Sequence, residues 1–255
     1  MRSIFLAAGL FLTLLMTSAQ AEDFRVESTV FENKNKEPIS QTSTVFRAGV
    51  VYDYMEGAGV TAVLDRARGR FILLDSTRGE KTEIKLEEIS AAVTEMGQSA
   101  GKSGNAFLKF AANPKFDIQA KDDSLEFRAA TLTYRARCVD APAAMAGQYR
   151  EFADWTSRLN AFMNPAVPPP FPRLLVNAEL ASRNLIPESI EMAIPKQLAL
   201  GGRGLTLRSE HVLTRRLLEK DQDQVAKTAN QMGTFKLVEF KLYRKNQLAA
   251  KVAAK

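Results

Sequence analysis

Hydrophobic and polar positions alternate with a period of two in the part of the chain that follows residue 23. Phe24, Val26 and Val30 alternate there with the charged residues Arg25 and Glu27. This period is typical of a β-strand with one buried face. Similar short segments separated by turns predict an antiparallel meander. Its further strands are expected in residues 42–55, as a hairpin around Ala48-Gly49, and in residues 60–64, 71–75 and 82–86.

A helical period replaces this alternation after Leu86. Ile89, Val93 and Met96 recur at three and four residues and predict a helix over residues 86–96. A flexible Gly/Ser loop is expected from Gly97 to Gly104. The clearest helix covers residues 143–163, with Trp155 beside its apolar stripe. Further helices are expected over residues 107–112, 174–182 and 221–232, the last with Asp221 as its N-cap and an end at Gly233.

Strand patterns return between these helices in the second half of the chain. They cover residues 116–120, 125–127, 131–138, 189–194, 205–215 and 238–242, with turns at residues 121–124 and 201–204. The segment Pro168–Pro172 predicts a stiff connector with polyproline character, or else a segment that docks on an aromatic groove. Residues 245–255 are rich in Lys and Ala and are expected to fray. These elements predict one α+β domain over residues 22–244.

The first 21 residues have the layout of a secretory signal peptide. A basic start at Arg2 precedes an apolar run from Ile4 to Met16 and small residues up to Ala21. The apolar run is too short to span a hydrocarbon core, which needs about 20 helical residues. We therefore expect cleavage between Ala21 and Glu22, export to the periplasm or beyond, and a mature protein that is soluble or peripheral to a membrane.

Composition narrows the chemistry that the exported chain can perform. Cys138 is the single cysteine and His211 the single histidine, which excludes an intramolecular disulfide and metal sites built from several His or Cys residues. We expect Cys138 to be a buried small hydrophobe. The net charge of +6, which loss of Arg2 lowers to +5, suits an anionic partner or simply a solvated surface. No basic run with interleaved aromatic residues indicates nucleic acid.

Two short motifs near residue 100 could carry chemistry. The segment from Gly97 to Ser103 resembles a phosphate-binding loop, but it has three residues between its glycines instead of four. Ser99 and Lys102 match the S-x-x-K pattern of some acylating enzymes. That pattern occurs by chance about once in a chain of this composition, and no S-D-N or K-T-G partner follows. A surface loop is the favoured interpretation of both motifs.

The remaining candidate residues have structural explanations that we favour. His211 could act as a base for a serine nucleophile, but its neighbour Glu210 is expected on the opposite strand face. Helix capping explains Asp221 and Asp223 better than metal binding. The acidic pair Glu87-Glu88 is explained by a position in the first turn of a helix. The pair Asp122-Asp123 is explained by a position in a hairpin turn. We predict no catalytic residue, no metal site and no cofactor; the ligand-binding residues cannot be assigned.

The N-terminal strands resemble the opening of LolA/LppX-type envelope proteins. The similar stretches are Phe46-Arg47-Ala48-Gly49-Val50-Val51-Tyr52-Asp53 and Ala62-Val63-Leu64-Asp65 with Arg70-Phe71-Ile72-Leu73-Leu74-Asp75. The resemblance implies a curved antiparallel sheet, like half a barrel, covered by helices around an apolar cavity for lipid or acyl chains. The Pro-rich connector departs from that pattern.

A second resemblance covers most of the mature chain. The stretches Tyr149 to Trp155, Pro168 to Asn177 and Ser209 to Asp221 are similar to an exported protein family common in planctomycete bacteria, which implies no particular activity. We therefore expect a non-catalytic envelope protein that binds a hydrophobic or lipid-like ligand. The alternatives are an interaction module for an anionic polymer or protein, and a serine hydrolase that uses Ser99 with Lys102, or His211.

Overall fold

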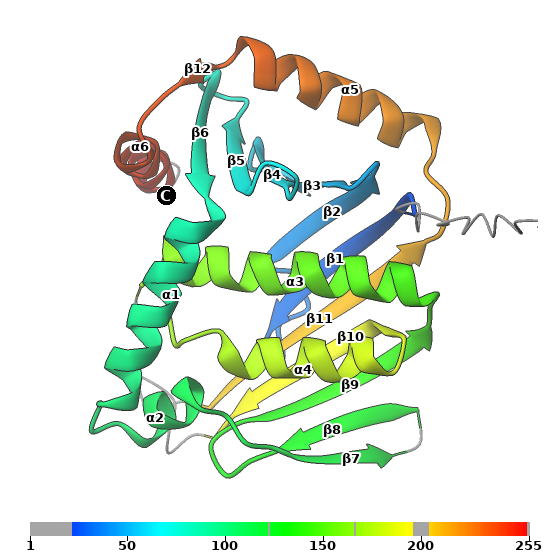
Figure 1. The fold of residues 1–255 in the computed structure, drawn as a ribbon, viewed down its shortest axis with the longest axis vertical. Coiled ribbons are helices and arrows are strands. Elements are labelled where there is room, and N and C mark those ends of the chain that lie inside the picture. Colours follow the sequence, from blue (N-terminus) through cyan, green and yellow to red (C-terminus); the bar gives the residue numbers. More distant parts are fainter. Residues whose placement is uncertain (1–21, 122, 166, 196–203, 254–255) are drawn as a thin grey trace, which may run out of the picture.

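The period-two segments of the sequence form the strands of one continuous sheet (Figure 1). The computed structural model describes residues 22–121, 123–165, 167–195 and 204–253. The predicted signal peptide and its last residue, Ala21, lie outside the described residues. The protein is of the α+β class, with twelve mostly antiparallel strands and six helices. The predicted fold class is therefore confirmed.

The strands and helices have the following bounds. The strands are β1 Phe24–Glu32, β2 Ser40–Arg47, β3 Val50–Met55, β4 Val60–Asp65, β5 Arg70–Asp75, β6 Glu80–Lys85, β7 Asp117–Lys121, β8 Ser124–Arg128, β9 Thr133–Asp140, β10 Leu185–Ile194, β11 Leu205–Thr214 and β12 Lys236–Leu237. The helices are α1 Leu86–Gly101, α2 Ala106–Ala112, α3 Ala143–Met163, α4 Phe171–Ser182, α5 Glu219–Thr234 and α6 Phe240–Ala253.

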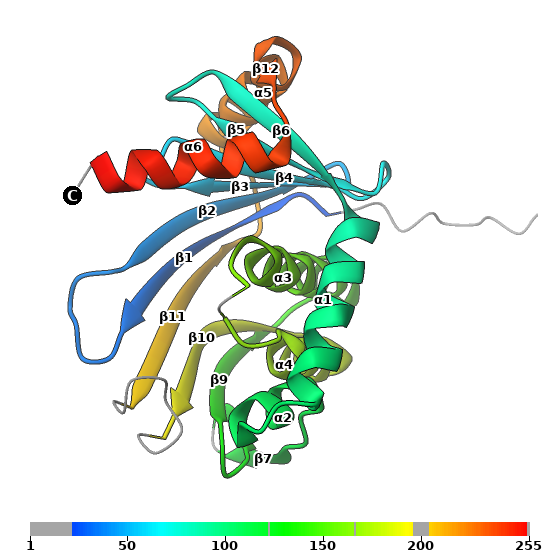
Figure 2. The same ribbon diagram turned by 90° about the vertical axis from the view of Figure 1, so that its left-hand side faces the viewer.

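The strand order joins the two halves of the sequence through β1. The order is β12-β6-β5-β4-β3-β2-β1-β11-β10-β9-β8-β7, so the first strand pairs with both β2 and β11. In the β1–β11 register, Ser28 lies opposite His211. Among the described strands, only the two-residue strand β12 pairs in parallel, with β6. Figure 2 shows the sheet curving around α3 and α4, as the half-barrel expectation requires.

Alternation along the strands divides the buried residues between two faces. We call the face that carries Phe24 and Phe46 the inner face, and α1, α3 and α6 pack on it. The outer face of β2–β5 carries Tyr52, Tyr54 and Leu74, and α5 covers it. A third cluster, around Phe127, fills the inner face of β8–β10 beneath α2 and α4. Strands β2–β5 thus have helices on both faces, whereas Glu83 and Lys85 of β6 are exposed.

The predicted loop from Gly97 to Gly104 is wrong in its first half, because α1 continues to Gly101. Gly97 faces the ring of Phe171 in α4, and a Cβ atom there would lie 2.7 Å from Phe171 Cε2. The glycine therefore permits close approach of two helices instead of ending one of them. The weak helix propensity of glycine is overridden here by packing.

The predicted strand over residues 238–242 is also wrong. After the two residues of β12, the chain forms α6, which extends through most of the segment that was expected to fray. Phe240 stacks on Phe162 of α3 with ring centroids 5.1 Å apart, and Tyr243 is buried. Phe240 and Tyr243 lie three residues apart and both make these contacts, which a helix allows and a strand does not. These contacts outweigh the short alternation of Val238, Phe240 and Leu242, which predicted a strand.

Two predicted boundaries move for local reasons. Helix α4 begins within the Pro-rich segment, since proline fits the first helical turn, and only Pro168–Pro170 stay outside a helix. Helix α5 begins at Glu219, so Asp221 is its third residue and not its N-cap. Asp221 Oδ2 accepts a hydrogen bond from the Leu218 amide at 2.8 Å. The turn predicted at residues 201–204 falls largely outside the described residues, and so does Asp122.

Candidate functional site

An apolar hollow lies between the inner face of the sheet and the helices α2, α3 and α4. We call it the inner pocket; its volume is about 310 Å³. Alternation along β9, β10 and β11 points every second side chain into this space. The sheet side consists of Leu132, Tyr134, Met192, Ile194, Leu205 and Leu207. The segment Pro168–Pro170, together with Pro172, covers it on the helix side. Mostly apolar hollows of this size are typical of small-molecule sites.

A second apolar hollow lies on the other side of the same Pro-rich segment. We call it the outer pocket; its volume is about 640 Å³, and α1, α2 and the end of α3 form it. Both pockets are lined by Phe107, Ala161, Val167, Pro168 and Pro169. The Pro-rich segment connects α3 to α4, as the connector interpretation predicts, and it also lies between the two apolar spaces.

One cation, Arg173, lines the inner pocket. It stands in the first turn of α4, and its Nε donates a hydrogen bond to Asn177 Oδ1 at 2.9 Å. Asn177 is buried, and its Nδ2 donates to Asp154 Oδ1 at 2.9 Å. Burial raises the pKa of Asp154, although Asn177 and nearby arginines oppose the shift. This relay holds the Arg173 guanidinium at the edge of the apolar space.

A polar cluster on the same inner face surrounds His211. Its Nδ1 lies 2.9 Å from Ser28 Oγ, and its Nε2 lies 3.0 Å from Ser209 Oγ. The Tyr149 ring of α3 meets the imidazole edge-on, with centroids 6.4 Å apart. Burial, with a smaller contribution from Arg173, lowers the pKa of His211 to about 3. The imidazole is therefore neutral at ordinary pH and is a poor general base, which needs a pKa near the working pH.

The predicted hydrolase residues do not meet around His211. Glu210 lies on the outer face, as expected, and pairs with Arg208. Ser99 lies in the last turn of α1 and Lys102 just after it; both line the outer pocket. A backbone hydrogen bond of 3.2 Å joins the Lys102 amide to the Ser99 carbonyl. The serines next to His211 are instead Ser28 and Ser209, which short sequence motifs gave no reason to select.

Cys138 and the acidic residues lie apart from the inner pocket, and Cys138 is half-buried, where a buried residue was expected. Cys138 packs against the inner cluster of β8–β10, and burial raises its pKa to about 12. Glu87 and Glu88 lie in the first turn of α1, and Asp123 pairs with Arg137 across a hairpin. Within the described residues, no group of three or more His, Cys, Asp or Glu side chains is placed to hold a metal ion.

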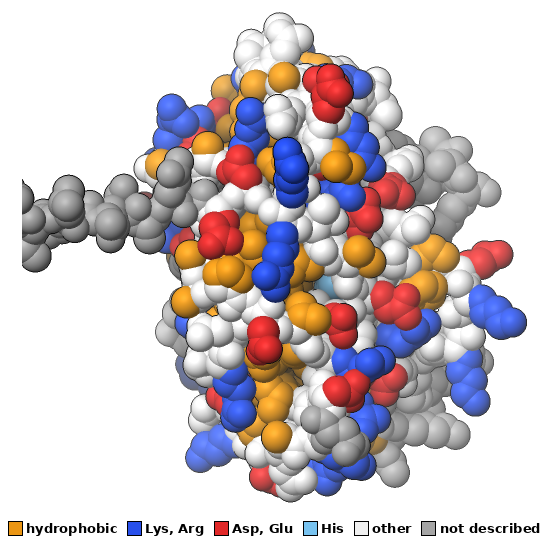
Figure 3. Space-filling view, turned by 90° about the vertical axis from the view of Figure 1, so that its right-hand side faces the viewer, with side chains coloured by type: hydrophobic (Ala, Val, Ile, Leu, Met, Phe, Trp, Pro, Cys, Tyr) orange, Lys and Arg blue, Asp and Glu red, His pale blue; other side chains and the backbone are white. Residues whose placement is uncertain are grey.

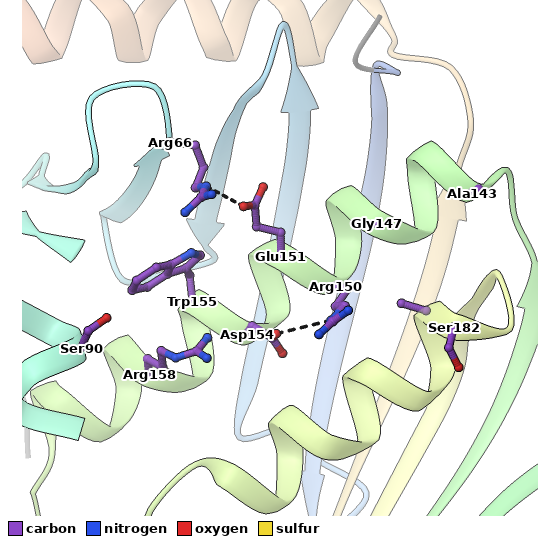
Figure 4. A pocket seen from close by; sticks show the side chains of 11 residues that line it. Arg66, Ser90, Ala143, Gly147, Arg150, Glu151, Asp154, Trp155, Arg158 and Ser182 are labelled. Carbon is purple, nitrogen blue, oxygen red and sulfur yellow. Dashed lines mark ion pairs between the residues drawn. The ribbon is translucent and has the colours of Figure 1, made fainter. Parts of the chain in front are cut away.

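A third hollow, shown in Figure 4, is polar and surrounds Trp155 on the exposed side of α3. The guanidinium carbons of Arg66 and Arg158 lie 5.9 and 5.2 Å from the indole centroid. Glu151 pairs with Arg66 at 2.6 Å, and Asp154 approaches Arg150 at 3.6 Å. Acidic partners therefore offset most of its positive charge. Trp155 lies in this polar hollow, apart from the apolar ones.

Arg173 and its relay are not among the residues that the sequence singled out. The available signal was a single cation in the otherwise apolar first half of α4, with Asn177 one helical turn further on. The signal could not be interpreted because the last member of the relay, Asp154, belongs to α3, and the sequence does not give the packing of α3 on α4.

Comparison with known proteins adds no family assignment. No protein-family model matches the chain, and no curated protein matches it significantly. Among the described helices, none is both long and apolar enough to cross a membrane. The class that fold and site define is an α+β protein with a curved antiparallel sheet and an apolar pocket beneath its helices.

Proposed function

We propose that this protein is exported to the cell envelope and binds a hydrophobic or lipid-like ligand there without catalysing a reaction. The observation that carries the proposal is the inner pocket, an apolar space of about 310 Å³ that has one charged residue, Arg173, among its described lining residues. Apolar lining with a few placed polar groups is typical of ligand sites. The curved sheet closed by helices is also what the resemblance to LolA/LppX-type proteins implies.

Mass spectrometry tests this proposal directly. The protein is purified from its own cell envelope, its mass is measured under native conditions, and any bound molecule is extracted into organic solvent. A stoichiometric apolar molecule is the expected result. A ligand-free mass, together with no binding of added lipids, would contradict the proposal.

A matched pair of variants assigns the ligand to the inner pocket. Leu207→Asn places an amide in the pocket and is expected to lower lipid affinity about tenfold, because apolar contact is lost. Val212→Asn makes a similar change on the same strand, where the side chain is 59% exposed on the outer face. Equal affinities of the two variants would place the ligand elsewhere.

A second candidate function is binding of an anionic polymer or protein partner through the polar hollow. The observation in its favour is the position of Trp155 between Arg66 and Arg158. Glu151 and Asp154 reduce the positive charge there, and Figure 3 shows both signs of charge interspersed over one face of the molecule. Salt-sensitive quenching of Trp155 fluorescence by an acidic polysaccharide would support this function.

A further inference from the structure

Arg173 differs from Arg66 and Arg150, its neighbours around α3, in how its charge is compensated. Within the described part of the chain, no carboxylate lies within 4.0 Å of its guanidinium, whereas Arg66 and Arg150 both have one. Asp154 reaches Arg173 only through Asn177. A cation at the edge of an apolar space is costly without a partner, so an anion that enters the pocket gains more there than at the surface.

The relay also orients the guanidinium. Because Nε is held by Asn177, the plane of the group is fixed. Among the described residues, no hydrogen bond occupies its two terminal amino groups, which can therefore donate to another acceptor. Two parallel N–H groups match the two oxygens of a carboxylate. The ligand head can therefore form a bidentate pair with Arg173.

The charge of the pocket favours a monoanion. His211 lies on the same inner face, but its pKa of about 3 keeps it neutral. Tyr134, which lines the pocket, is also kept neutral because burial raises its pKa. Arg173 is thus the single cation among the lining residues in the described part of the chain. One cation matches a carboxylate better than a doubly charged phosphate monoester.

The rest of the pocket fits an apolar tail. Leu132, Met192, Ile194 and Leu205 offer no charge, and a volume of about 310 Å³ is at the lower end for ligand sites. We propose that the ligand is a single-chain carboxylate of the fatty-acid type, with its head on Arg173 and its chain in the inner pocket. This inference rests on the proposed apolar ligand and names its chemical class.

Calorimetric titration with three C12 amphiphiles tests the inference: dodecanoate, dodecanol and dodecyl phosphate, each below its micelle concentration. The wild-type protein is expected to bind dodecanoate about 10- to 100-fold more tightly than dodecanol, the range of a charge-assisted hydrogen-bonded pair. Decanoate should bind about 15-fold more weakly than dodecanoate, because two methylenes are lost.

Variants assign the preference to one side chain. Arg173→Gln should bind dodecanoate and dodecanol equally, and Arg173→Lys should keep part of the preference. The matched control is Arg183→Gln, which removes the same charge from an exposed site just after α4, where the residue pairs with Glu179. Arg183→Gln should behave like the wild type. Circular dichroism confirms folding of each variant, and Arg173→Lys serves if Arg173→Gln does not fold.

The outcomes separate the two proposals. Equal binding of dodecanoate and dodecanol by the wild type would overturn the role of Arg173 but leave the apolar pocket standing. Tighter, Arg173-dependent binding of dodecyl phosphate would overturn the carboxylate. Absence of binding by all three amphiphiles would overturn the proposed function and this inference with it.

Discussion

The two halves of the sheet differ in how many of their faces are covered by helices. Strands β2–β5, the two-sided half, have α1, α3 and α6 on their inner face and α5 on their outer face. Strands β7–β11, the one-sided half, bury their inner face under α2, α3 and α4. On their outer face Arg135, Arg137 and Val212 are exposed. The candidate site belongs to the one-sided half, where apolar packing is incomplete.

The sequence carries this difference in its patterns. The strand Phe71–Leu74 is apolar at four successive positions and is buried on both faces. In β9, Tyr134 and Ala136 are buried and alternate with the exposed Arg135 and Arg137. Continuous apolar runs indicate burial on both faces, and alternation indicates burial on one. In this protein the more apolar of the two hollows of about 310 Å³ lies in the one-sided half, whereas the one beneath α5 in the two-sided half is lined by polar residues such as Thr61 and Gln224.

Among the substitutions predicted below, removal of the Asp221 side chain should destabilise the two-sided half most. Arg25 Nη1 donates to Asp221 Oδ1 at 2.9 Å, and both residues are buried. The pair fixes α5 to the first strand. Asp221→Ala leaves a buried cation with only the partly exposed Glu27, and is expected to lower the free energy of unfolding by about 3–5 kcal/mol.

Urea denaturation measures this loss. The control is Asp223→Ala in the same helix, which is exposed and should change stability by less than about 0.5 kcal/mol. Losses of similar size in both variants would show that the buried pair does not hold α5.

Truncation on the outer face tests the comparison itself. Leu74 is fully buried under α5, and Leu74→Ala should cost about 2–4 kcal/mol. Val212 lies on the outer face of the one-sided half and is 59% exposed, so Val212→Ala should cost less than about 0.5 kcal/mol. Chemical denaturation of both variants gives the difference. A large loss from Val212→Ala would mean that the outer face of the one-sided half is also covered.

The pH dependence of stability should differ in sign between two inner-face residues. Burial raises the pKa of Asp53, in the two-sided half, to about 6, although Thr44 donates a hydrogen bond to it at 2.7 Å. The folded state then holds a proton that the unfolded state releases, so Asp53 lowers stability as the pH rises from about 4 to 6. Relative to the wild type, Asp53→Asn should raise the free energy of unfolding by about 1–2 kcal/mol at pH 7 and change it little at pH 4.

His211, in the one-sided half, should act in the opposite direction. Its folded pKa of about 3 lies below the ordinary value of 6.5, so the unfolded state binds the extra proton. Stability is therefore lost as the pH falls from about 6.5 towards 3. In His211→Gln the part of the acid-induced loss of stability that His211 causes, about 1–2 kcal/mol, should disappear. Unfolding curves from pH 4 to 7, each compared with wild type, separate the two effects; parallel pH profiles of wild type and variant would refute the corresponding shift.

Much of the fold follows from local pattern. The period-two segments predict the meander β1–β6 and the strands β7–β11, and the stripe of α3 predicts that helix with its observed bounds. The sequence pattern predicts the wrong element where a contact with a distant residue determines the local structure. Gly97 continues a helix because it faces Phe171, and Phe240 turns helical because it stacks on Phe162.

The candidate site depended even more on distant contacts. The apolar residues of β9–β11 are evident in the sequence, but the pocket exists only because the Pro-rich segment lies over them. Ser99 and Lys102 could be selected from the sequence because they are close together in it. Arg173, Asn177 and Asp154 could not, because their relay joins two helices.

The sequence by itself determined the class of the protein, its strands and the faces that they bury, because side-chain periodicity is a local property. The tertiary structure decided which helices cover which face, which charges are paired and where space is left over. These depend on contacts between residues up to 196 positions apart, such as Arg25 with Asp221, and the energy of a buried pair is set by its surroundings, not by its neighbours in sequence.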